Sequence, residues 1–155
     1  MNRMEYPTWL EYPEALAELR LRRGRGKDEI AFLCNPQGLA SVAAVLLWLS
    51  HFTDPSGVSI TALPFVSAAG ALALSVVMTN DEQGQQGRLV KVDKDREFEW
   101  QIHYHELRRV AAQLYAAATH FDQVGHVAVR LKDNSDASLV FENTNPRKPS
   151  DQLAT

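Results

Sequence analysis

The sequence predicts a single α+β domain, with helices segregated from a mainly antiparallel sheet of about five or six strands. Its 155 residues are 45% hydrophobic and 23% charged, which is ordinary globular composition. Apolar residues recur every three or four positions in some segments and every second position in others, with turn signals between them. We expect two N-terminal helices, a further helix between strands, one domain over residues 1–144 and a disordered tail over residues 145–155. The sequence shows no internal repeat.

Both N-terminal helices are predicted from apolar spacing. Four apolar residues at helical intervals predict an amphipathic helix over residues 9–23, ending at Gly24: Trp9, Tyr12, Leu16 and Leu19. After the turn signal at residues 35–38, residues 39–52 are apolar nearly all round, as expected of a buried helix.

Residues 58–79 contain no charge over 22 positions, so they fit either a membrane-spanning helix or two buried strands. Pro64, Gly70 and several hydroxyl side chains interrupt the run, and basic residues flank both of its ends. These features favour two strands, over residues 58–66 and 72–79.

The C-terminal half has the clearest strand and helix patterns. A loop over residues 80–87 predicts a hairpin between the strand ending near residue 79 and one over residues 88–94. Strict alternation over residues 97–104 predicts a strand with one exposed face. A helix over residues 105–121 follows, and then two strands around residues 127–131 and 139–141, joined by a turn at residues 133–136.

Charge and cysteine content exclude some functional classes. Sixteen basic and nineteen acidic residues give a net charge of −3, which argues against nucleic acid as the partner. The single cysteine, Cys34, cannot form an internal disulfide, and the N-terminal residues do not have the pattern of a secretion signal. We therefore expect a cytoplasmic protein.

The densest basic run has five basic residues in eight positions and is a candidate contact for phosphate or an acidic partner: Arg20, Arg22, Arg23, Arg25 and Lys27. If the preceding helix ends at Gly24, cations in its last turn also complement the helix dipole. That local role is the simpler interpretation of the run.

Histidines near the strand-to-helix junction form a candidate metal site, with four possible ligands: His103, His105, Glu106 and His120. This predicts, as an alternative function, a small metal-assisted enzyme. Histidines on the surface near helix ends are the commoner explanation of such a pattern.

The functional hypothesis that ranks first is a non-enzymatic protein-binding module of the immunity, inhibitor or adaptor kind. Alternation places several polar side chains on one exposed strand face, and the candidate partner-binding residues are these and their neighbours: Asp93, Asp95, Glu97, Glu99, Gln101 and His103. No cofactor is expected, because the sequence has no dinucleotide, P-loop, zincin or nucleophile-elbow motif. The expected partner is another protein; an open sheet edge would allow a homodimer, and membrane attachment through residues 58–79 is the weaker alternative.

Overall fold

The computed structural model describes residues 2–3, 13–24, 26–52, 56–79, 86–92 and 96–144. The described strands are β1 (Asn2–Arg3), β2 (Ala17–Arg22), β3 (Asp28–Cys34), β4 (Ser56–Ser59), β5 (Val66–Ala68), β6 (Ala73–Thr79), β7 (Arg88–Lys91), β8 (Glu97–His103), β9 (His126–Val129) and β10 (Ala137–Asn143). The helices of the same residues are α1 (Pro36–Leu49), α2 (Tyr104–Ala118), the short α3 (Phe121–Val124) and the 3-10 turn η2 (Ile60–Ala62).

The strands form two mixed sheets. The first has the order β1-β4-β6-β8-β7 and the second the order β5-β2-β3-β10-β9. At the centre of each sheet lies a parallel pair, β6 with β8 and β3 with β10, and antiparallel strands flank each pair. The predicted α+β class is confirmed, but the sheets are not mainly antiparallel, because each central pair joins strands that are distant in sequence.

The helix predicted over residues 9–23 is wrong in its described part, which is strand β2. Ala17, Leu19 and Leu21 alternate with charged residues, so the segment also fits a strand of period two. Antiparallel pairing with β3 over six residues decides between the two patterns. Residues 9–12 lie outside the described residues.

The second predicted helix is confirmed as α1, which starts three residues earlier than expected. The Asn35 side chain caps it by accepting a hydrogen bond from the Gly38 amide at 2.7 Å, and Pro36 occupies the first helical position. The turn signal at residues 35–38 is therefore the start of the helix.

The uncharged run is divided among several elements. The strand predicted over residues 58–66 is split into β4, η2 and the start of β5, and β5 joins the other sheet. The second predicted strand is confirmed as β6. Among the described residues, no helix is long and apolar enough to cross a membrane.

The C-terminal half follows the predictions except for one hairpin. Strand β8, helix α2 and the β9–β10 hairpin are confirmed. The hairpin predicted between β6 and β7 is wrong, because β8 lies between these two strands and pairs with both.

The order of elements repeats, although the sequence shows no repeat. The half β2-β3-α1-β4-β6 has the same order as β7-β8-α2-β9-β10, and each sheet takes one antiparallel pair from each half. The parallel pairing of β2 with β5 also has a counterpart, the bridge between Gly87 and Leu131. Counting along the paired strands makes Trp100 equivalent to Phe32 and His103 equivalent to Asn35, and the last two are the N-caps of α2 and α1.

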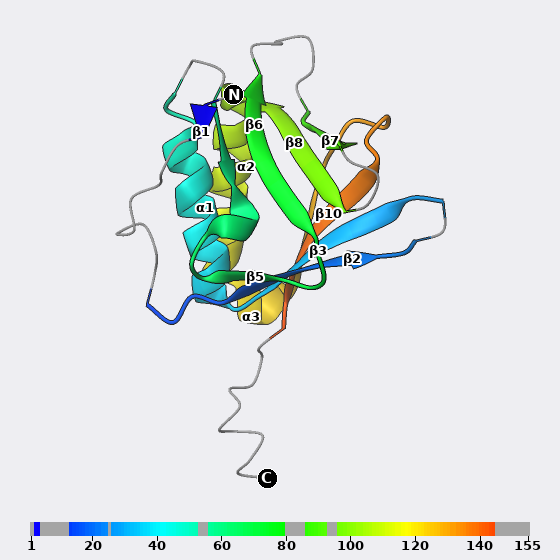
Figure 1. The fold of residues 1–155 in the computed structure, drawn as a ribbon. Coiled ribbons are helices and arrows are strands. Elements are labelled where there is room, and N and C mark those ends of the chain that lie inside the picture. Colours follow the sequence, from blue (N-terminus) through cyan, green and yellow to red (C-terminus); the bar gives the residue numbers. More distant parts are fainter. Residues whose placement is uncertain are drawn as a thin grey trace.

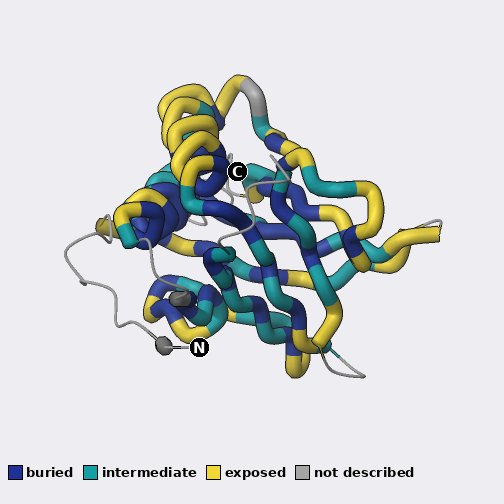
Figure 2. The backbone as a smooth tube through the Cα atoms, turned by 90° about the horizontal axis from the view of Figure 1, so that it is seen from above, coloured by how far each residue is buried: buried dark blue, intermediate teal, exposed yellow. Residues whose placement is uncertain are grey.

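The hydrophobic core lies between the two sheets and the α1–α2 helix pair, which stands to one side of the strands (Figure 1). Figure 2 shows buried positions in the middle of the strands and exposed positions on the outer sides of the helices. Phe32 and Phe141 stack across the central β3–β10 pair with ring centroids 4.4 Å apart, and Trp100 occupies the equivalent position in the other sheet. Burial of such side chains contributes roughly 1.5–3 kcal/mol each.

Candidate functional site

The predicted recognition strand, β8, has one face in the core and one outside. Phe98, Trp100 and Ile102 are buried, Glu97 is exposed, and Glu99 and Gln101 are half-buried. Strand register extends this outer face onto β6 and β7, because Gln101 lies opposite Val77 and Arg88 and Glu99 lies opposite Ser75 and Val90. We call this surface the β8 face; it consists of Ser75, Val77, Arg88, Val90, Glu97, Glu99 and Gln101.

The two glutamates of the β8 face are not neutralised. Arg88 Nη2 donates to Gln101 Oε1 at 3.1 Å, and Gln101 Nε2 donates to Glu99 Oε1 at 3.4 Å. Within the described part of the chain, neither Glu97 nor Glu99 forms an ion pair. The face therefore presents net negative charge on a framework of short side chains.

His103 does not lie on the exposed face as predicted. Its exposed fraction is 8%, and its Nδ1 accepts a hydrogen bond from the His105 amide at 3.2 Å as the N-cap of α2. His103 therefore acts as a buried helix cap, although it lines the same cleft as Arg88 and Gln101. The candidate residues Asp93 and Asp95 lie outside the described residues.

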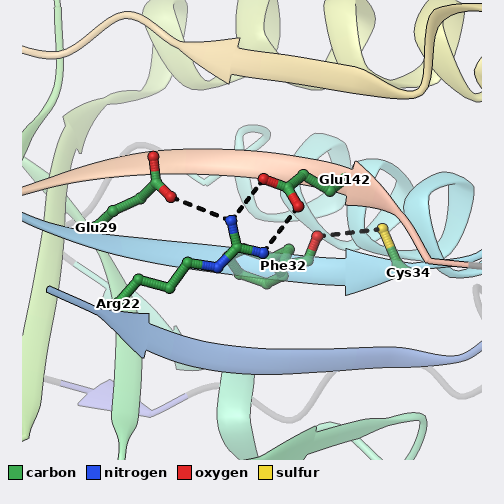
Figure 3. Close-up of polar contacts among 5 residues, drawn as sticks. All are labelled: Arg22, Glu29, Phe32, Cys34 and Glu142. Carbon is green, nitrogen blue, oxygen red and sulfur yellow. Dashed lines mark hydrogen bonds and ion pairs between the residues drawn. The ribbon is translucent and has the colours of Figure 1, made fainter. Parts of the chain in front are cut away.

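The charged side chains on the outer face of the second sheet bond to one another (Figure 3). Arg22 reaches across β3 and donates to both carboxylate oxygens of Glu142, at 2.7 and 2.8 Å, and to Glu29 at 3.4 Å. The hydrogen bond from Arg22 holds the pKa of Glu142 below its usual value and, together with the carboxylate charges, raises the pKa of Arg22. Ala31 and Val140, on the same face, are fully buried.

Most residues of the basic run have hydrogen-bond partners within the protein. Arg20 pairs with Glu18 at 3.1 Å, Arg22 forms the network above, and the Lys27 ammonium donates to the Asp133 carbonyl at 3.0 Å. Arg23 is exposed, and Arg25 lies outside the described residues. The run follows a strand into a turn, so the predicted complementation of a helix dipole is wrong.

The four candidate metal ligands do not form one site, although the rings of His103 and His105 stack with centroids 5.2 Å apart. His103 and His120 flank the two ends of α2, which at 1.5 Å per residue separates them by roughly 22 Å. Glu106 is buried and bonded to Arg109. No group of three or more potential ligands that could hold a metal ion occurs within the described ranges.

Each sheet has a cleft where its central parallel strands end. The cleft beside β6 and β8 has a volume of about 130 Å³, and the one beside β3 and β10 about 630 Å³. Six lining positions are equivalent in the two clefts. In matching order they are Gln86, Arg88, Gln101, His103, Lys132 and Thr79 in the small cleft, and Leu16, Glu18, Leu33, Asn35, Ser67 and Thr144 in the large one.

The equivalence shows that the backbone makes these clefts and the side chains decide their chemistry. At the carboxyl end of a parallel strand the chain turns away from the sheet to begin a helix. This turn opens a crevice at the strand ends. One crevice is lined with polar and cationic groups, the other with several apolar side chains that include Leu16, Leu33 and Phe65. Sequence patterns did not predict Arg88 or Lys132 as site residues, because only tertiary pairing brings them together.

No protein-family model matches the chain, and no curated protein or solved structure is significantly similar to it. The functional interpretation therefore depends on the geometry of these surfaces.

Proposed function

We propose that the protein is a non-enzymatic protein-binding module, of the immunity, inhibitor or adaptor kind, that docks a partner protein on the β8 face. The observation that carries the proposal is the pair of unneutralised glutamates, Glu97 and Glu99, on the outer face of a central strand. A cytoplasmic location is part of the proposal and fits a chain with one buried, unpaired cysteine.

The contrast with the other glutamates of the described strands and helices supports this choice of surface. Four described glutamates elsewhere on strands and helices each have an arginine partner: Glu18, Glu29, Glu106 and Glu142. Keeping like charges close together without a counterion opposes folding, so such a pair is more readily explained by recognition than by stability.

The geometry of the face defines the chemistry of the partner. Glu97 and Glu99 are two residues apart on one strand face, which separates them by roughly 6.8 Å. Short or compact side chains on β6, such as Ser75 and Val77, leave the approach to them open. A partner with two or more Lys or Arg side chains at a similar spacing would complement this surface, and the charge would act mainly on association rate and specificity.

The test compares two charge reversals that change the net charge equally. We expect the double variant Glu97→Lys and Glu99→Lys to bind its partner about tenfold more weakly or worse, with greater loss at low salt. The control carries Glu14→Lys and Asp133→Lys, two exposed acids outside the face, and should bind like the natural protein.

The measurement is native mass spectrometry of untagged protein purified from its own cells, followed by titration of the partner found there. Circular dichroism of each variant establishes that it is folded. Unchanged affinity in the folded Glu97→Lys and Glu99→Lys variant, or equal loss in the control, would refute docking on the β8 face.

A further inference from the structure

The small cleft at the ends of β6 and β8 contains two cations without an acidic partner. Arg88 donates only to the neutral amide of Gln101, and no ion pair or hydrogen bond involves the Lys132 ammonium among the described residues. Arg20, Arg22 and Arg109, in contrast, each form an ion pair with a carboxylate of the protein itself. Two cationic residues that line one small volume repel each other unless an anion lies between them.

We propose that this cleft binds a small oxyanion, a phosphate or carboxylate group, between Arg88 and Lys132. Thr79, Gln86 and Gln101 line the same space and offer hydroxyl and amide hydrogen-bond donors to such an anion. No described lining residue is acidic.

The size of the cleft restricts the ligand. Its volume of about 130 Å³ is well below the roughly 300 Å³ at which drug-sized ligand pockets begin. The cleft accommodates a single phosphate or carboxylate group, so any larger molecule that carries the group would remain mostly outside.

Two further features favour negative charge there. The cleft reaches His103, the N-cap of the 15-residue helix α2, whose first amides carry partial positive charge. The acidic residue of the first helical turn, Glu106, is bonded to Arg109 and is not part of the lining. At the equivalent positions of the large cleft, Arg88 and Lys132 are replaced by Glu18 and Ser67, so the cationic lining belongs to one half only.

The experiment is an amide chemical-shift titration of the full chain with sodium phosphate and, separately, with sodium acetate at constant ionic strength in chloride. We expect saturable shifts at residues 86–88, 101–103 and 132. The variant with Arg88→Gln and Lys132→Gln should bind about tenfold more weakly or worse, because charge-assisted hydrogen bonds are lost. The control with Lys91→Gln and Arg130→Gln, two cations outside the lining, should bind within about twofold of the natural protein.

Saturable binding of phosphate alone would assign the cleft to phosphate groups, and comparable binding of acetate would assign it to oxyanions in general; both support the proposal. Shifts that do not saturate with either anion, or that are equal in the Arg88→Gln and Lys132→Gln variant, would overturn it. Because the titration uses the anion alone, its result is independent of partner docking on the β8 face.

Discussion

The two halves of this protein have the same order of strands and helices, but the two sheets that they form together differ in the chemistry of their surfaces. On the outer face of the second sheet, Arg22 forms ion pairs with Glu29 and Glu142, and the cleft of this sheet has a partly apolar lining. On the β8 face, Glu97 and Glu99 form no ion pair with any described residue, and the adjoining cleft is cationic.

The difference teaches that the topology supplies the positions and the individual side chains supply the function. Equivalent backbone positions carry Arg88 in one half and Glu18 in the other, or Val77 in one half and Glu142 in the other. In the second sheet, the charged side chains form ion pairs with one another. In the first sheet, charged side chains remain that a ligand or partner can pair with.

The largest expected effect concerns the thiol behind the large cleft. Cys34 has an exposed fraction of 1%, and burial raises its pKa to about 12, from 9.0. At pH 8 the thiolate population falls on the order of 10³-fold relative to an ordinary thiol, so we expect no labelling by a thiol reagent until the protein is unfolded in urea. Rapid labelling of the native protein would show that the cleft opens into the core, unlike its small counterpart.

A second test exchanges the packing of the two halves. A Cβ added at Gly87 would lie 2.6 Å from Trp100 Nε1, whereas the equivalent position in the other half is Ala17. Gly87→Ala should therefore lower the free energy of unfolding by roughly 1–3 kcal/mol through overpacking.

The matched background for this change is Trp100→Phe, which copies the aromatic residue of the other half. The indole Nε1 has no hydrogen-bond partner among the described residues, so the replacement loses none. We expect the cost of Gly87→Ala to fall by about half or more in this background, as measured by urea denaturation in a double-mutant cycle. Additive costs would contradict the structural equivalence of the two positions.

A third test removes the internal neutralisation of the second sheet. Because Arg22 and Glu142 are partly exposed, solvent screening limits their pairing, and Arg22→Ala should cost only about 1 kcal/mol at pH 7. Arg20→Ala breaks a more exposed pair, with Glu18, and serves as the control with a smaller expected loss.

The pH dependence follows from the lowered pKa of Glu142. The stabilisation that the Arg22–Glu142 pair contributes is complete above the ordinary glutamate pKa, about 4.3. It disappears as the pH falls through the lowered pKa of Glu142 in the folded state. Urea denaturation at pH 7 and pH 3 should therefore show the natural protein and the Arg22→Ala variant converging in stability at the lower pH. An undiminished difference at pH 3 would exclude the Glu142 carboxylate as the cause.

Local patterns predicted those elements whose boundaries depend on nearby residues. The alternation of β8, the periodicity of α2 and the turn between β9 and β10 all appear in the structure. The helix prediction was wrong for residues 17–22, because Ala17, Leu19 and Leu21 fit both a strand and a longer helical pattern. Pairing with β3 decided in favour of the strand. The candidate face was predicted in part, since Glu97, Glu99 and Gln101 lie on it, while His103 is buried as a helix cap.

The sequence by itself determined the α+β class, the alternating strand β8 and the buried helix that follows Asn35, because these depend on residues that are neighbours along the chain. Tertiary structure alone decided that the strands form two mixed sheets, that the halves repeat each other, and that Arg88 and Lys132 share a cleft. The physical reason is that parallel pairs such as β3 with β10 and β6 with β8 join distant segments, and their register is set by burial of the whole core rather than by any local pattern.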